Sequence, residues 1–123
     1  MAYIAIDTEK YIGQSVGSGQ CVAFVQKCAG APLTRCWKEG EKVRGADIPR
    51  GTAIATFQNG QYQNDTHGNS HAAIYLEQDD KAIYVLDQWI RPNYAQEVHR
   101  RPIQFRGGKG ASCDDGDAYS VIE

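Results

Sequence analysis

The hydrophobic and polar positions that follow Gln20 repeat with the period of a helix. Residues spaced i, i+3, i+4 and i+7 form one apolar stripe, as expected for the buried side of an amphipathic helix. The stripe consists of Cys21, Phe24, Val25 and Cys28. Gly30 and Pro32 follow in "AGAP" and cannot extend the helix. The pattern predicts a helix that starts at Gln20, carries Cys21 in its first turn and stops near "AGAP".

After Pro49 the pattern changes to short runs of β-branched and aromatic residues bounded by turn residues, which is typical of strands. The runs are 51–57, 71–76 and 82–89, with shorter candidates at 102–106 and 118–123. A helix followed by an antiparallel meander predicts an α+β fold, in which the N-terminal helix that carries Cys21 packs on an antiparallel sheet.

The remaining segments are less regular. Residues 8–13 are predicted to form a short helix capped by Asp7 or Thr8, and a second helical turn is predicted at Cys36 and Trp37. Thirteen glycines indicate a loop-rich fold. Long connections are expected around 58–70 and 106–117, and connections of this length inside a compact domain are often functional.

Composition limits the class of protein. The chain has 123 residues, which fits one domain over 1–123, with 41% hydrophobic and 23% charged residues as in ordinary globular proteins. A formal net charge of −2 argues against sequence-independent nucleic-acid binding, which needs clustered cations. No apolar run approaches the ~20 residues that span a bilayer, so no membrane insertion is expected. Asp7 and Glu9 interrupt the place of a signal peptide, and we expect none.

Strand pairing brings together two residues that could act in acid–base catalysis. If "EQDDK" is the loop between 71–76 and 82–89, Leu76 faces Ala82 and His71 faces Asp87. Directly opposed residues of antiparallel strands point to the same face, with Cβ atoms ~5 Å apart. A loop one residue shorter would place Gln88 opposite His71 instead. The arithmetic predicts a His–Asp pair.

This pair gives Cys21 a possible partner. A thiol at a helix N-terminus lies at the positive end of the helix dipole, which favours the thiolate. Cys21 as nucleophile, His71 as base and Asp87 as the group that orients His71 would form a catalytic relay. The N–H of Cys21 would help to hold an oxyanion, with Gln14 or Gln20 as a weaker side-chain donor. The alternatives for Cys21 are a buried thiol, a disulfide or a metal ligand.

The other cysteines and the aromatic residue near Asp87 have simpler interpretations. Trp89 lies two residues past Asp87 on the same strand face, where it would be buried and would shield the relay from water or contact substrate. A disulfide between Cys28 and Cys36 is plausible in an oxidising compartment, and two free thiols are nearly as plausible. Cys113 could also pair with either of them, since sequence cannot fix connectivity.

Metal sites are not expected. His67 and His71 are four residues apart in "HGNSH", but no CxxC pair accompanies them and a glycine interrupts the helix that such a pair needs. "DDGD" at 114–117 lacks the other ligands of a calcium loop. We interpret it as a solvated turn, and we expect no cofactor.

The motifs "GQCVAFV", "GTAIATF", "HAAIYL" and "VLDQW", in this order, resemble those of the small NlpC/P60 and CHAP-type cysteine peptidases of the papain-like fold. The resemblance covers most of residues 11–106 and is greatest to the amidase effectors of bacterial type VI secretion systems. It implies Cys21 as nucleophile, His71 as base and Asp87 as third member. In other branches of the family this third residue is often His, Asn or Glu.

The resemblance also implies a substrate and partners. The expected reaction is cleavage of amide bonds in peptidoglycan peptide stems, in the periplasm of a target bacterium. Loops 58–70 and 90–99 would shape the substrate pocket. The expected partners are a secretion apparatus, which agrees with the missing signal peptide, and an immunity protein in the producing cell.

Two other functions remain open from the residues. The same relay serves deamidases and transglutaminases that act on glutamines of protein substrates. Alternatively, the chain is a binding module on a degenerate peptidase fold, with Cys21 an ordinary thiol. Selective alkylation of Cys21 at neutral pH would favour the nucleophile.

Overall fold

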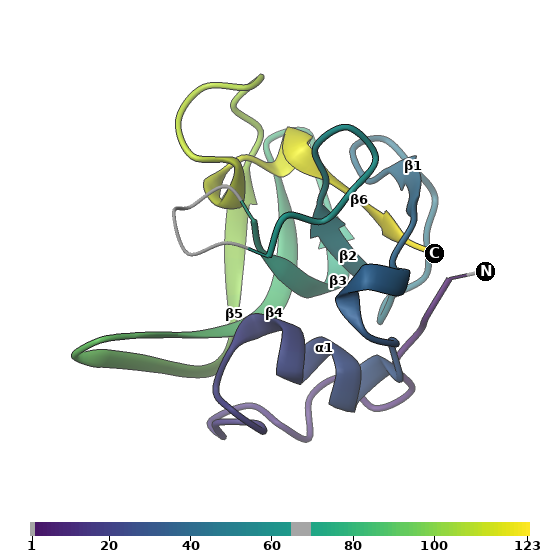
Figure 1. Cartoon of the computed structure of the whole chain (residues 1–123). Coiled ribbons are helices and arrows are strands. Elements are labelled where there is room, and N and C mark those ends of the chain that lie inside the picture. The colour runs from purple at the N-terminus through teal and green to yellow at the C-terminus, as the bar shows by residue number, and fades with distance from the viewer. Residues whose placement is uncertain (1, 65–69) are drawn as a thin grey trace.

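The computed structural model describes residues 2–64 and 70–123. Its helix α1 (Cys21–Ala29) packs against a six-stranded antiparallel sheet with strand order β1-β6-β2-β3-β4-β5 (Figure 1). The strands are β1 (Glu39–Lys42), β2 (Ala53–Thr56), β3 (Ala72–Gln78), β4 (Ala82–Arg91), β5 (Tyr94–Gln104) and β6 (Tyr119–Ile122). Three short 3-10 helices are η1 (Thr34–Cys36), η2 (Ser112–Asp114) and η3 (Gly116–Ala118). The predicted α+β fold is confirmed.

Helix α1 begins and ends where the sequence pattern predicts. Gln20 is the extended N-cap residue, and Gly30 takes a left-handed conformation (φ 73°) while its N–H donates to Gln26. Phe24 and Val25 are buried against the sheet. This arrangement holds Cys21 at the start of a helix whose axis is fixed by the core.

Side chains of the central strands alternate between two buried clusters. Alternate residues of β2 to β4, including Ala55, Ile74 and Leu86, pack in the same cluster as the buried residues of α1. Their neighbours Ile54 and Val85 belong to the second cluster. Because both faces of these strands are buried, their positions are well determined, which favours a rigid platform for a site at the strand ends.

The hairpin between β3 and β4 differs from the predicted register. Ile74 pairs with Leu86, and a bulge lies between Tyr75 and Glu77. The carboxylate of Asp79 accepts hydrogen bonds from the N–H groups of the following residues 81 and 82, which tightens the loop to residues 79–81. The predicted five-residue loop, with Leu76 opposite Ala82, was therefore wrong.

The predicted His–Asp pair nevertheless forms. Extending the observed register to His71 places it opposite Trp89, two residues beyond the predicted partner Asp87. Side chains alternate with period two along a strand, so an error of two residues leaves His71 and Asp87 on the same face. The alternative of Gln88 opposite His71 is not observed.

Other segments also depart from expectation. Residues 8–13 form bends and turns rather than a helix, because the backbone at Gly13 and Gln14 pairs with Val98 of β5. The predicted turn at Cys36 is present as η1. Strand β1 was missed because "EGEK" has no apolar alternation, and β5 is much longer than predicted because its first half is polar. Within the described residues, no helix has the length and apolar character needed to cross a membrane.

Candidate active site

The loop before α1 is held by a buried glutamine of the sheet. The amide of Gln88 on β4 donates to the carbonyl oxygens of Val16 and Gln20 and accepts from the Val16 N–H, each at 2.8 Å. Between these anchors Gly17 and Gly19 have positive φ angles of 57° and 89°. A side chain at Gly19 would also approach Ile90 within 3.6 Å. These contacts fix the backbone that presents the next residue, Cys21.

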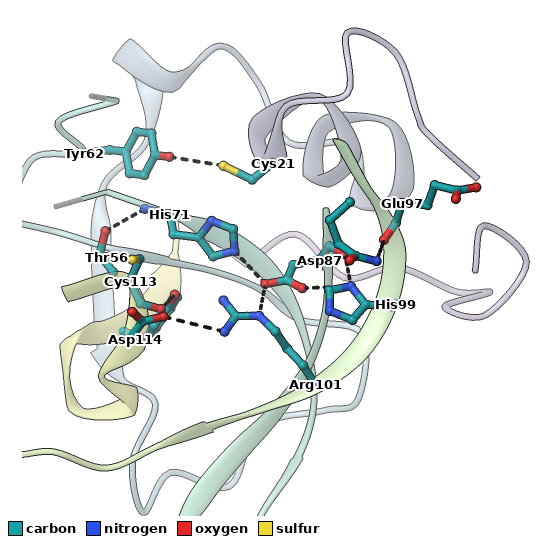
Figure 2. Close-up of polar contacts among 12 residues, drawn as sticks. Cys21, Thr56, Tyr62, His71, Asp87, Glu97, His99, Arg101, Cys113 and Asp114 are labelled. Carbon is teal, nitrogen blue, oxygen red and sulfur yellow. Dashed lines mark hydrogen bonds and ion pairs between the residues drawn. The ribbon is translucent and has the colours of Figure 1, made fainter. Parts of the chain in front are cut away.

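His71 stands at the start of β3 with its backbone and its ring both held. Thr56 of β2 accepts a hydrogen bond from the His71 N–H with its hydroxyl and donates its own N–H to the His71 carbonyl, each at 3.0 Å. The ring Nε2 lies 2.7 Å from Oδ2 of Asp87, which is fully buried on β4 (Figure 2). With Nε2 occupied, Nδ1 is the ring nitrogen available to Cys21.

Asp87 has further partners that the sequence did not suggest. The Nε of Arg101 on β5 donates to the same Oδ2 at 2.7 Å, and an Arg101 Nη lies 3.9 Å from Asp114. His99 sits directly opposite Asp87 on β5, with its Nδ1 3.2 Å from the Asp87 carbonyl oxygen and 3.7 Å from Oδ1. Oδ1 has no hydrogen-bond partner among the described residues. The carboxylate is therefore held as an anion by the cation of Arg101.

Trp89 is half-buried and covers this cluster. Its ring centroid is 6.4 Å from that of His71 and 5.2 Å from that of His99, both edge to face. The guanidinium of Arg101 lies 5.2 Å from the Trp89 ring. The predicted proximity of Trp89 to the His–Asp pair is thus observed.

Tyr62 contacts the thiol directly. Its hydroxyl is 3.8 Å from Sγ of Cys21 (Figure 2). Its ring packs on Trp37 with centroids 4.7 Å apart and the ring planes tilted by 51°. Phe57 adds an edge-to-face contact at 6.5 Å. The connection 58–70 was predicted to shape the pocket, but no sequence pattern singled out Tyr62, because a polar connection has no pairing pattern that predicts the position of its residues.

The ionisation of the site follows from these contacts. Burial raises the pKa of the Cys21 thiol, but the hydrogen bond and charge of His71 outweigh it, helped by the Ala72 backbone and the Tyr62 hydroxyl, so the pKa is lowered. Burial lowers the pKa of His71, and Asp87 and the Cys21 thiolate more than reverse this and raise it to about 9. The pKa of Asp87 is lowered, since His71 and Arg101 outweigh burial.

These directions favour a thiolate paired with an imidazolium at neutral pH. The thiols of Cys28 and Cys113 behave differently. Burial, which is not offset by a neighbouring imidazole, raises the pKa of both. Cys21 is therefore the cysteine whose surroundings suit a nucleophile.

The thiol opens into a cavity of about 680 Å³. Its lining comes from the start of α1, the start of β3, the end of β4, β5 and η2. The residues are Gln20, Cys21, Ser70, His71, Trp89, Ile90, Arg91, Pro92, Arg101, Cys113 and Asp114. The predicted wall at 90–99 is represented by residues 90–92, and the predicted wall at 58–70 by Ser70. The long connection 106–117, which was not assigned to the wall, contributes Cys113 and Asp114.

Of the two glutamines predicted as oxyanion donors, only Gln20 lies at the cavity. Gln20 lines the cavity beside Cys21, and its side chain makes no capping hydrogen bond to α1. Gln14 is exposed, and its amide donates to the Lys10 carbonyl. Gln14 is not among the residues that line the cavity, so the structure does not bring it to the thiol.

Of the two alternatives for Cys28 and Cys36, the structure has the free thiols and not the disulfide, and Cys21 and Cys113 are free as well. Cys28 packs on the core below α1, whereas Cys36 is exposed in η1. His67 lies outside the described residues.

Among the residues that are described, no group of three or more His, Cys, Asp or Glu side chains is placed to hold a metal. The carboxylates of Asp115 and Asp117 accept hydrogen bonds from backbone N–H groups of residues 106–108, as in a closed turn.

Comparison with known proteins places this geometry in a family. The sequence profile described as domesticated amidase effector 2 matches residues 2–122. The chain belongs to this amidase effector family. It is 35% identical over 127 residues to the type VI secretion amidase effector 2 protein of Salmonella typhi, covering 95% of this chain and 91% of the relative.

The solved structure of a type 6 secretion amidase effector 2 superposes with a TM-score of 0.83 at 31% identity, covering 98% of this chain and 94% of that one. Membership of the amidase effector family confirms the predicted resemblance and the predicted papain-like α+β fold. Together with the solved structure, it also supports the predicted class of hydrolase.

Proposed function

We propose that the chain is a peptidoglycan amidase that hydrolyses amide bonds in peptide stems or crosslinks, and that residues 1–123 form one amidase domain. The observation that carries the proposal is the pairing of a low-pKa thiol at the start of α1 with an imidazole bonded to a buried carboxylate. A chain of the amidase effector family with this arrangement has the nucleophile, the proton carrier and the orienting anion that amide cleavage needs.

In the first step the Cys21 thiolate attacks the carbonyl carbon of the scissile amide, and the electron pair of the C=O bond moves to oxygen. The N–H of Cys21 is in the first turn of α1, where backbone donors lack helical partners, and it would stabilise this oxyanion with the Gln20 side chain. As the oxyanion collapses, the C–N bond breaks. The imidazolium of His71 donates its Nδ1 proton to the departing amine.

In the second step water completes the hydrolysis. Neutral His71 accepts a proton from a water molecule as its oxygen attacks the thioester carbonyl. The C–S bond then breaks, which releases a stem carboxyl and restores the Cys21 thiolate beside protonated His71. Asp87 holds Nε2 throughout, so that Nδ1 always faces the thiol.

The names of the relatives support a route to the substrate. They are described as type VI secretion amidase effectors, so we propose delivery by a secretion apparatus and action on the stems of a target cell's wall in the periplasm. A producing cell exposed to such an enzyme would need an immunity protein. The cavity around Cys21 is the surface that this partner would have to block.

Digestion of purified peptidoglycan sacculi tests the function. Wild type, Cys21→Ala and the matched control Cys113→Ala, which removes another thiol of the same cavity, would be incubated under reducing conditions. Soluble products would be separated and identified by mass. New muropeptides with wild type and Cys113→Ala but not with Cys21→Ala are expected, and their masses identify the bond.

No release by any of the three proteins would overturn the wall-hydrolase proposal. A one-dalton increase in a protein substrate would then support the deamidase alternative. Delivery is tested separately by producing the protein in bacteria with and without an export signal. Lysis is expected only with export and an intact Cys21, and equal lysis without export would contradict a periplasmic target.

A further inference from the structure

Strand β4 carries a row of side chains that leads from the His–Asp pair toward the cavity opening. Asp87, Trp89 and Arg91 occupy alternate positions, so they lie on one face of the strand. The irregularity in the β4–β5 pairing adds its extra residue to β5, and the alternation along β4 is unbroken. Both Trp89 and Arg91 line the cavity that contains Cys21. Arg91 is thus about 7 Å along the strand beyond the tryptophan that contacts His71.

Arg91 and Arg101, the two arginines of the cavity, have different surroundings. Arg101 is occupied by Asp87 at 2.7 Å and Asp114 at 3.9 Å. Arg91 is exposed and forms no ion pair with any residue that the structure describes. Burial and the charge of Asp114 raise the pKa of Cys113, and the positive charges of Arg101 and Arg91 oppose this increase. The charge of Arg91 therefore acts on a thiol that lines the same cavity.

The backbone that carries Arg91 is well held. Arg91 is the last residue of β4 and pairs with Tyr94, across the turn of residues 92–93. The neighbouring Ile90 side chain is within ordinary contact distance of the position of a Cβ on Gly19, in the loop before Cys21. The β4–β5 hairpin extends beyond the rest of the sheet in Figure 1, and its Ile90, two residues before the turn, lies close to the loop that presents the nucleophile.

We propose that Arg91 binds a free carboxylate of the peptide stem close to the scissile bond, and that this contact makes the enzyme prefer stems with a carboxylate to stems in which it is amidated. The inference rests on the proposed function and names one recognition element of the same site. A guanidinium forms two parallel hydrogen bonds with a carboxylate, but a carboxamide offers only one acceptor oxygen and no charge. Ile90 and Pro92, the neighbours of Arg91 along the chain, also line the cavity, and their apolar side chains offer no hydrogen-bond donor that would compete with the guanidinium for a carboxylate.

The test compares two synthetic stem peptides that differ only in one carboxylate, free or amidated, next to the bond identified by digestion. Wild type, Arg91→Gln, Arg91→Lys and the control Arg100→Gln would be assayed on both. Arg100 belongs to the same hairpin, does not line the cavity, and forms an exposed ion pair with Glu77, so the control removes the same charge elsewhere.

Wild type is expected to prefer the free carboxylate about tenfold in kcat/KM, mainly through KM. Arg91→Gln should lose this preference by losing activity on the carboxylate substrate alone, and Arg91→Lys should retain part of it, since it keeps the charge without the fork. Arg100→Gln should behave as wild type.

Equal use of both peptides by wild type, or an unchanged preference in Arg91→Gln, would overturn the assignment of Arg91 while leaving the amidase intact. If wild type cleaves neither of the two peptides nor sacculi, it is the proposed function that fails. Thermal unfolding of each variant shows whether a change in rate reflects loss of fold.

Discussion

Replacing Asp87 with asparagine removes one negative charge from the site with little change in shape. The Asn side-chain oxygen can still accept a hydrogen bond from Nε2 of His71, so the ring keeps its orientation. What is lost is the charge that stabilises the imidazolium, with which Oδ2 of Asp87 is in contact at 2.7 Å. The variant therefore separates the electrostatic role of Asp87 from its orienting role.

The expected effect of Asp87→Asn on the ionisation of the site follows from the pKa of His71, which is about 9 in place of the usual 6.5. This increase in the pKa is worth about 3 kcal/mol, and it is a net value after the opposing effect of burial. Both Asp87 and the Cys21 thiolate contribute to this increase in the pKa of His71. We expect its charge to account for about 1–2 pH units, so proton transfer from Cys21 to His71 becomes about 10- to 100-fold less favourable.

Alkylation by iodoacetamide measures how readily the Cys21 thiolate forms, and it needs no substrate. The rate at Cys21 would be followed from pH 4 to 10, with peptide mass spectrometry to separate it from the other cysteines. Cys21 of the wild type should react at a pH below the ordinary thiol pKa, because the pKa of Cys21 is lowered. In Asp87→Asn the rise of the rate should move to higher pH. Superimposable profiles would refute the electrostatic role of Asp87.

Two further variants keep this test interpretable. Asp114→Asn removes another carboxylate near Arg101 without contacting His71, and its alkylation profile should match wild type. Asp87→Asn also leaves the largely buried Arg101 without its main partner, which can cost about 3–5 kcal/mol of stability. If the single variant unfolds, adding Arg101→Gln removes the unpaired charge, and the same shift in the profile is expected.

Three other predictions concern the same site. Hydrolysis should lose rate above about pH 9, as His71 loses the proton that it donates to the leaving amine, and a pH–rate profile without this decline would contradict the imidazolium as acid. Tyr62→Phe keeps the packing on Trp37 but removes the hydroxyl that helps to lower the pKa of Cys21, so alkylation at pH 6 should slow by about two- to fivefold. Gln88→Leu should lower the unfolding free energy by about 1–3 kcal/mol, because buried backbone groups in the loop before α1 lose their hydrogen-bond partners. Urea titration measures this loss, and an unchanged urea midpoint would show that Gln88 does not hold the loop.

The sequence predicted the parts of the site that depend on periodic patterns. The helical stripe placed Cys21 at the start of α1, and Gly30 marked the end of that helix. The pair of His71 and Asp87 was found despite a register error of two residues, because only the parity of the register determines the face of a strand.

The remaining partners come from contacts that carry no local signal. Arg101 and His99 reach Asp87 only because β5 continues to Tyr94 through a polar stretch, and polar stretches do not predict strands. Tyr62 reaches the thiol from an irregular connection. The short η2 brings Asp114 to the cavity through a loop organised by the buried carboxylate of Asp115.

Other errors have a common physical origin in the competition between local and tertiary interactions. A six-residue helix at 8–13 is too short to be stable alone, and pairing of Gly13 with Val98 replaces it. The spacing of Cys28 and Cys36 allowed a disulfide, but the core holds the first thiol while η1 exposes the second.

Attack of Cys21 on a peptidoglycan stem amide is the step on which the proposed function depends. The most direct measurement uses a stem peptide in which the bond identified by digestion is replaced by a chloromethyl ketone, with the modified residue located by peptide mass spectrometry. We expect one adduct, on Cys21. Its formation should slow when soluble peptidoglycan fragments compete for the cavity, and it should be absent in His71→Ala at pH 6. Modification spread over Cys28, Cys36 and Cys113, or labelling of Cys21 that peptidoglycan fragments do not slow, would contradict the proposed attack.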